Sequence, residues 1–315
     1  MDYEQNLVVR IAWLYYKEGL TQQDIGDKLG ISRQRVIKYL DTARLANVVQ
    51  FQIDLAAQNY LDVQNALMER YHLDDVYVAP PPVPGVSSSH TVSVAAAQYV
   101  GHKLDNANQY SINVGAGKTV TNILSHLTVP ANKTLTMISL TGGVHYYLHP
   151  QGPFNIIHSP QERIRSYIIP APLCASTAEA ARCFMNEPSV KSIMNMTKLA
   201  DMTLLGIGVA TQNATMVEEG IMSSNDIAIL QMQNAVGDML SQYYDINGHR
   251  VEFEMHDRFV TSHLDILKEL KNVVGVAGGK EKVQPLLGAL NGGYLNVLIT
   301  DLETAQAVLE AGDKA

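Results

Sequence analysis

The sequence predicts an α/β protein with two domains: an N-terminal all-α, winged helix-turn-helix domain, followed by a larger Rossmann-like domain with a doubly wound parallel sheet. Three observations lead to this prediction. Residues 21–46 show a helix-break-helix pattern, units of apolar strand, glycine turn and helix repeat after residue 74, and the pattern changes near residue 55. We therefore expect domains at 1–55 and 56–315, and the 315 residues suffice for two.

The segment from residue 21 to 46 contains apolar residues that one helical period cannot align, whereas two short helices with a break at Gly30 can. Thr21 and Asp24 form a capping-box-like start for the first helix, and Ser32 can cap the second. Glycine ends a helix well because it enters a left-handed turn without strain. The apolar positions are Ile25, Leu29, Ile31, Val36, Tyr39 and Leu40.

The second of these helices has a polar face suited to DNA. Val36, Tyr39 and Leu40 share the opposite, inward side at 100° per residue. Amide and basic groups at the exposed N-terminal end of such a helix can reach base edges and phosphates. An ordinary helical hairpin with a solvated face is the alternative, and the combined caps, turn and chemistry favour DNA. The predicted DNA-binding residues are Ser32, Arg33, Gln34, Arg35 and Lys38.

Charge is distributed unevenly along the chain. The net charge is −8, yet residues 1–50 carry seven Lys/Arg against six Asp/Glu, and residues 32–46 carry four cations and one anion. Such a small positive module binds DNA weakly and in a salt-sensitive way by electrostatics alone. We therefore expect several copies to act on one DNA.

The remaining helices and strands are predicted from the spacing of apolar residues. A helix with apolar positions 7, 8, 11, 14 and 15 is expected to pack on the helix-turn-helix, while Trp13 and Tyr16 could join that core or contact another subunit. Alternation over 48–55 predicts a strand, and 60–72 a helix. Further on, strands are expected at 74–79, 110–114, 135–140, 166–169, 202–205, 273–276 and 295–299, with helices at 92–104 and, after a capping box at 300–303, through Leu309.

The turn at residues 115–119 follows a strand and opens a helix, where backbone amides can hold an anion. It matches neither a P-loop, because Ile112 stands where the first glycine is needed, nor GxGxxG, because of Val120. A tight strand–helix turn is an equally good interpretation in isolation. The candidate ligand-binding residues here are Gly115, Gly117, Lys118, Thr119 and Thr121.

Further glycine turns at 140–143, 206–208 and 275–279 also follow predicted strands and should converge at the carboxyl edge of the sheet, where ligands bind. Asp238 can accept hydrogen bonds from sugar hydroxyls or cap a helix. Small residues with two lysine anchors suit a polar, phosphorylated or unphosphorylated, small ligand better than a nucleotide. The additional candidates are Gly142, Gly143, Asp238, Gly279 and Lys282.

No cofactor, metal or membrane association is expected. Cys174 and Cys183 have no metal-ligand spacing and are expected to be buried free thiols in a reducing cytoplasm. No apolar run approaches a membrane span. His145, His149 and His158 are taken as polar loop residues rather than metal ligands. The loop that contains them could cover the pocket.

These motifs, in this order, resemble the SorC/DeoR-type sugar-responsive bacterial regulators almost from end to end. The matching segments are VVRIAWLYYKEGLTQQDIGDKLGISRQRVIKYL, VGAGKT, SLTGGV, IIPAPL, GIG, AVGD, GVAGGKEK and GGYLNVLITD. The resemblance implies an effector domain similar to the sugar-phosphate isomerase and deaminase fold. It also implies a homo-oligomer, a tetramer, that binds operator DNA and responds to a sugar or sugar phosphate, with control of a sorbose-type catabolic operon.

Carried onto this chain, the family's phosphate loop falls on Gly115, Gly117, Lys118 and Thr119, its second glycine turn on Gly142 and Gly143, its acidic position on Asp238 and its lysine on Lys282. Cys174 stands where some relatives carry Arg after the PAPL motif. This difference removes a cation and allows an unphosphorylated sugar.

The alternative is a sugar-phosphate isomerase or deaminase with an appended DNA-binding domain. Enzymes of the fold place acid–base residues after the GIG turn, but residues 209–213 here are VATQN, without Asp, Glu or His. Asp238 remains a possible base without an evident partner. We therefore expect no catalytic residues and a regulator rather than an enzyme.

Overall fold

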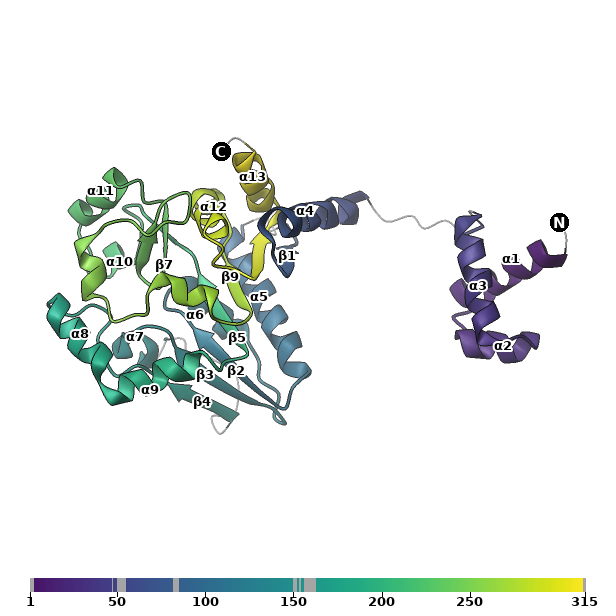
Figure 1. Ribbon diagram of the computed structural model, residues 1–315, viewed down its shortest axis with the longest axis horizontal. Helices are drawn as coiled ribbons and strands as arrows, with labels where there is room; N and C mark the ends of the chain where they lie inside the picture. Colours follow the sequence, from purple (N-terminus) through teal and green to yellow (C-terminus); the bar gives the residue numbers. More distant parts are fainter. Residues whose placement is uncertain are drawn as a thin grey trace. The chain divides into compact units, whose positions relative to one another are not determined.

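The computed structural model describes residues 3–46, 48–49, 55–81, 85–149, 152, 154–155 and 163–313. The chain divides into two compact units, Met1–Gln58 and Asn59–Ala315. Each unit has its own hydrophobic core. Figure 1 shows both, coloured along the chain.

The first unit consists of α1 (Tyr3–Tyr16), α2 (Gln22–Leu29) and α3 (Arg33–Leu45). The predicted helix-turn-helix is confirmed with its caps: Thr21 and Asp24 form a capping box, and Gly30 ends α2 with φ 67°. Ser32 caps α3 through a hydrogen bond from the Arg35 N–H. Apolar positions of all three helices meet in one core that includes Val8, Ile11, Ile25, Val36 and Leu40.

The two aromatic residues of α1 that sequence analysis left open, Trp13 and Tyr16, differ in their packing: Tyr16 packs against the core of this unit. The Trp13 side chain is 58% exposed, so it is not part of the core of this unit. The Tyr16 hydroxyl accepts a hydrogen bond from Arg44 Nε at 3.0 Å and ties the end of α1 to α3. The strand expected over 48–55 lies largely outside the described residues.

The second unit contains the predicted parallel sheet, with seven strands in the order β1-β10-β9-β5-β2-β3-β4. All neighbouring pairs are parallel. The strands are β1 (Asp75–Ala79), β2 (Gln109–Val114), β3 (Thr134–Ser139), β4 (Ile164–Tyr167), β5 (Met202–Gly206), β9 (Val273–Val276) and β10 (Val297–Asp301).

Helices cover both faces of this sheet, and each face has its own core. On one face α5 and α6 pack against residues such as Ile112 and Leu204, and on the other α4, α12 and α13 pack against residues such as Leu298. The helices of this unit are α4 (Leu55–Tyr71), α5 (Ser88–Asp105), α6 (Lys118–His126), α7 (Val144–Leu148), α8 (Ala178–Asn186), α9 (Pro188–Thr197), α10 (Thr215–Glu218), α11 (Ser224–Met232), α12 (Val283–Asn291) and α13 (Leu302–Gly312), with short 3-10 turns at Glu254–Arg258, Leu264–Lys268 and Lys280–Lys282.

Strand order reverses between β2 and β5. From β2 the chain proceeds outward through β3 and β4, whereas β5, β9 and β10 fill the other side. The turns that follow β2 and β5 therefore face each other across the point where open α/β sheets bind ligands. A second, antiparallel sheet of β6 (Gly208–Val209), β7 (Gly237–Met239) and β8 (Gln242–Tyr244) follows directly after β5.

Several element boundaries differ from those predicted: β4 covers residues 164–167 instead of 166–169, and α5 begins at Ser88 instead of Val92. The last strand continues to Asp301 instead of ending at Ile299. Asp301, rather than Thr300, caps α13, because its Oδ1 accepts the Thr304 N–H at 2.9 Å. The antiparallel sheet was not predicted, since strands of two or three residues are too short to show a pattern. Within the described part of the chain, no helix is long and apolar enough to cross a membrane.

Candidate functional site: a recognition helix and a cavity at the sheet edge

The N-terminal half of α3 places the predicted DNA-binding residues on an exposed surface. Arg33, Gln34, Arg35 and Lys38 are all exposed. The Ser32 hydroxyl is occupied as the helix cap. Hydrogen bonds orient both arginines. Arg33 Nε donates to Gln22 Oε1 at 3.2 Å, and Arg35 Nη2 donates to the Tyr39 hydroxyl at 3.2 Å. These contacts hold cationic groups in place on the face that the sequence predicts for DNA.

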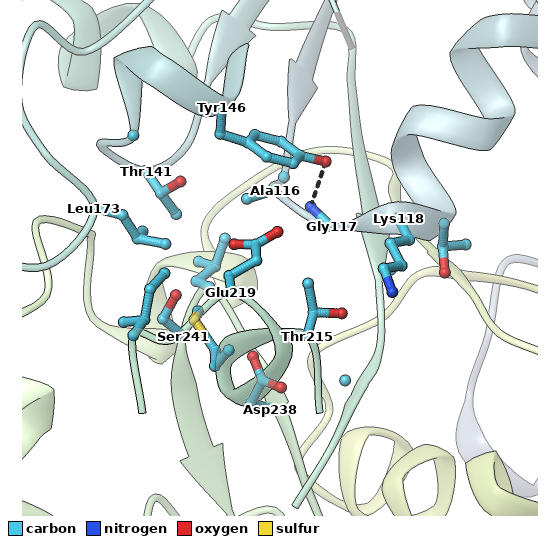
Figure 2. Close-up of a pocket in the computed structure, with 18 of the residues that line it drawn as sticks. Ala116, Gly117, Lys118, Thr141, Tyr146, Leu173, Thr215, Glu219, Asp238 and Ser241 are labelled. Atoms are coloured by element: carbon cyan, nitrogen blue, oxygen red, sulfur yellow. Dashed lines mark hydrogen bonds between the residues drawn. The ribbon is translucent and has the colours of Figure 1, made fainter. Parts of the chain in front are cut away.

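A cavity of about 1290 Å³ lies at the carboxyl edge of the parallel sheet. It is lined by the turns after β2, β3 and β5, by residues 170–174 and by the start of β7. Figure 2 shows ten labelled residues around it. Nine of the ten predicted ligand-binding residues line it: Gly115, Gly117, Lys118, Thr119, Thr121, Gly142, Gly143, Asp238 and Lys282.

Gly279, the tenth predicted residue, is not among the residues that line this cavity. Its N–H donates to Asp301 Oδ2 at 3.1 Å and to Thr304 Oγ1 at 2.8 Å. This amide therefore anchors the glycine turn after β9 to the start of α13. Its φ of 110° is favourable for glycine, so the residue has a structural reason to be glycine.

Two amides of the turn after β2 are bonded within the protein. The Gly115 N–H is bonded to the Leu204 carbonyl at 3.0 Å, within the switch point of the sheet. The Gly117 N–H donates to the Tyr146 hydroxyl at 2.9 Å, shown as a dashed line in Figure 2. That hydroxyl is also 2.6 Å from Thr121 Oγ1. Tyr146 of α7 therefore occupies one of the amides at residues 115–119 that the sequence predicts for an anion.

The Gly142–Gly143 turn allows two backbones to approach closely. A Cβ on Gly142 would lie 2.3 Å from the Pro172 carbonyl oxygen. The Gly142 N–H donates to the Val260 carbonyl at 2.7 Å, and the Gly143 N–H donates to the Ala171 carbonyl at 2.8 Å. These glycines shape the cavity wall, and their amides are used within the protein.

Asp238 and Lys282 lie at the opposite side of the cavity, where β6 pairs with β7. A Cβ on Gly208 would lie 1.8 Å from Asp238 Oδ1, so only glycine leaves room for this carboxylate. Burial raises the pKa of Asp238 to about 6, opposed by attraction to Lys282 and a backbone hydrogen bond from Ser241. Lys282 Nζ donates to the Ile207 carbonyl at 2.8 Å, and burial lowers its pKa.

The raised pKa of Asp238 predicts a pH dependence of stability. Because the folded pKa of about 6 lies above the ordinary 3.8, the folded protein holds a proton that the unfolded chain has lost. The contribution of Asp238 to the free energy of unfolding should therefore increase as the pH falls from about 7 to about 5. Urea unfolding of the natural protein and of Asp238→Asn at both pH values measures it. An equal pH dependence in the two proteins contradicts the assignment.

The structure adds residues that sequence analysis missed. Tyr146 and Glu219 line the cavity, and Glu218 forms an ion pair with Lys118. Burial raises the pKa of Glu219, and nearby Lys118 opposes the rise. The only sequence signal was the adjacent pair of carboxylates, which follows the GIG turn by about ten residues. Nothing in the sequence spacing indicates that α10 places these two carboxylates beside the turn after β2.

The described residues around this cavity include no evident set of metal ligands. Among the described residues, no group of three or more His, Cys, Asp or Glu side chains is placed to hold a metal ion. His158 lies outside the described residues. Both cysteines are free thiols, but the prediction that they are buried is wrong: Cys174 is half-buried in the cavity wall, and Cys183 is exposed on α8.

A helix-turn-helix joined to a doubly wound domain with a polar cavity at its switch point defines a ligand-binding transcriptional regulator. Residues 56–310 match the family model described as "Putative sugar-binding domain", and residues 5–44 match that of sigma-70 region 4. The chain belongs to the SorC/DeoR-type family of sugar-binding transcriptional regulators.

Several relatives extend over almost the whole chain. The transcriptional regulator LsrR of Enterobacter sp. (strain 638) is 33% identical over 310 residues, covering 97% of this chain and 93% of the relative. LsrR of Escherichia coli (strain K12) is 32% identical over 315 residues, covering 98% and 96%. The crystal structure of the full-length sorbitol operon regulator SorC from Klebsiella pneumoniae shares the fold, with a TM-score of 0.68 at 24% identity, covering 98% of this chain and 100% of that one.

Proposed function

We propose that this protein regulates transcription of a bacterial carbohydrate operon in the cytoplasm, with a sugar or sugar phosphate bound in the cavity as its effector. The observation that carries the proposal is the convergence of nine predicted residues on one cavity at the switch point, in a chain that begins with a helix-turn-helix. A sorbose-type operon is the specific candidate, from the resemblance of the motifs.

On the DNA side, we assign Arg33, Gln34, Arg35 and Lys38 to contacts with the operator. Gln34 and the arginines have the hydrogen-bonding geometry for base edges, and Lys38 suits a phosphate. Ser32 contributes by fixing the start of the helix. The first turn of the recognition helix is the part that enters the major groove in this class of motif.

We further propose that the protein acts as a homo-oligomer, a tetramer. One helix-turn-helix per chain requires at least two chains for an operator with two half-sites. The local charge of the recognition segment is too small for tight binding by a single copy. Sedimentation equilibrium of the free protein tests this proposal, and a monomer at micromolar concentration contradicts it.

Binding rather than catalysis is the role proposed for the cavity. The GIG turn continues through residues that cannot move a proton, and the relatives are named as regulators. Glu219 and Asp238 do line the same cavity, so the enzyme alternative has a concrete pair of candidates. Turnover of a sugar phosphate by purified protein, lost in Asp238→Asn, contradicts the binding role.

The proposed function is tested by operator binding in the presence of candidate effectors. The operator is first selected from random duplex DNA by the purified protein. Gel shifts are then run with a panel of ketoses, alditols and their phosphates. A changed operator affinity with at least one member is expected, because the effector must bind one arrangement of subunits better than the other. An unchanged affinity across the panel contradicts ligand control.

Lys282→Ala is expected to abolish the effector response while operator binding is retained. The substitution leaves Asp238 without the nearby cation that stabilises its charge, and it removes an ammonium group from the cavity. Lys280→Ala is the matched control, because Lys280 is exposed two residues away and does not line the cavity. Equal responses of the two variants in the gel shift contradict the role of Lys282.

A further inference from the structure

We propose that Tyr39 is a positioning residue for operator binding, which holds the guanidinium group of Arg35 in place before the protein meets DNA. This inference rests on the proposed function, because it assigns a role to a residue that lies behind the surface proposed to contact DNA. Arg35 Nη2 donates to the Tyr39 hydroxyl at 3.2 Å. The guanidinium carbon of Arg35 also lies 5.9 Å from the centre of the Tyr39 ring, within the range of a cation–π interaction. Two different interactions therefore join the same pair of side chains.

The ring of Tyr39 is itself fixed by the core of the first unit. Tyr39 is 9% exposed and belongs to the same core as Val36, Leu40 and Ala43. An aromatic side chain on a helix points back toward the N-terminal turn, and the Tyr39 hydroxyl accordingly meets Arg35, one turn earlier in α3. A side chain that packing has locked is a firm support for a binding group, because it needs no further ordering when the partner binds.

Arg35 remains available to DNA although it is held. It is exposed, and among the described residues it forms no ion pair with a carboxylate. Arg44, in the last turn of the same helix, shows the opposite arrangement. It donates to the Tyr16 hydroxyl and also pairs with Asp41, with 3.5 Å between Nη1 and Oδ1. The uncharged hydroxyl of Tyr39 thus orients Arg35 without neutralising its charge.

Orientation before binding increases affinity because it reduces the loss of side-chain freedom on binding. Arginine has many rotamers, and fixing one such side chain at an interface weakens binding by roughly two- to tenfold. Arg33 provides a contrast within the same unit. Its Nε donates to Gln22 Oε1, but Gln22 is not part of the core, so packing does not lock this support. Tyr39 is therefore the firmer of the two supports and the one to which we assign the positioning role.

A double-mutant cycle tests this role. Fluorescence anisotropy gives the operator affinity of the natural protein, Tyr39→Phe, Arg35→Ala and the double variant. Tyr39→Phe keeps the ring in the core and removes only the hydroxyl, so it should weaken operator binding about threefold or more. In the Arg35→Ala background the same substitution should have no effect, because no guanidinium group remains to be held. Affinity for non-specific DNA depends mainly on charge and should be equal in Tyr39→Phe and the natural protein.

Tyr16→Phe is the matched control, because it removes a tyrosine hydroxyl that bonds an arginine at the other end of α3. This variant should bind the operator as the natural protein does. Unchanged operator affinity in Tyr39→Phe overturns the positioning role. An equal loss with and without Arg35, an equal loss for non-specific DNA, or an equal loss in Tyr16→Phe overturns it as well. Each of these results leaves the proposed function standing, whereas failure of the natural protein to bind any selected duplex contradicts both.

Discussion

Gly208→Ala is expected to weaken binding of the effector strongly. The added methyl carbon would lie 1.8 Å from Asp238 Oδ1, so the carboxylate has to leave its position between β6 and β7. Asp238 is a partly buried acceptor that lines the cavity, and loss of its charge-assisted hydrogen bonds should weaken effector binding by about a hundredfold. Titration calorimetry with the effector measures the loss. Operator binding should continue without an effector response.

Gly101→Ala is the control for this substitution. Gly101 lies within α5, and a Cβ there meets no atom within 4 Å. Alanine also favours a helix, so this variant should bind the effector as the natural protein does. Full effector affinity in Gly208→Ala would show that the position of Asp238 has no role in binding. A variant that has also lost operator binding points to a wider structural change.

Arg35→Ala is expected to weaken operator binding strongly while the effector affinity stays unchanged. Loss of one arginine contact to DNA costs about 1–3 kcal/mol per contact. In an oligomer that uses two or more recognition helices, the loss is repeated in each copy. Fluorescence anisotropy with labelled operator measures it. The salt dependence of binding should also become less steep if Arg35 contacts a phosphate.

Arg44→Ala is the matched control in the same helix. Arg44 lies in the last turn of α3 and is bonded to the Tyr16 hydroxyl, away from the exposed N-terminal end. The substitution Arg44→Ala removes the same charge from the same unit as Arg35→Ala, and it should reduce operator affinity much less than Arg35→Ala does. Equal losses in the two variants would mean that net charge, and not the position on the recognition face, determines binding.

Much of the fold could be predicted because it depends on interactions between residues that are close in the sequence. The boundaries of the helix-turn-helix follow from Thr21, Gly30 and Ser32, whose effects extend only three or four residues. The parallel strands are recognisable because both of their faces are buried. Because the strands are parallel, the glycine turns that follow them lie at one edge of the sheet, so their convergence could be predicted as well.

The parts that could not be predicted depend on contacts between distant segments. Gly279 is bonded to residues 22 and 25 positions away, and this contact turns its amide away from the ligand-binding role expected of it. Tyr146 reaches the Gly117 amide from 29 positions away, and Glu218 reaches Lys118 from 100. These contacts give Lys118 an anionic partner and the Gly117 amide a hydroxyl partner within the protein.

The central claim is that the cavity and the recognition helix are thermodynamically coupled. If an effector changes operator affinity by a given factor, operator DNA must change effector affinity by the same factor. Both factors can be measured with the same protein, by anisotropy with and without effector and by calorimetry with and without operator. We expect the two factors to agree and to be about fivefold or more. A factor of one in both titrations, with effector and operator bound at the same time, would contradict the claim.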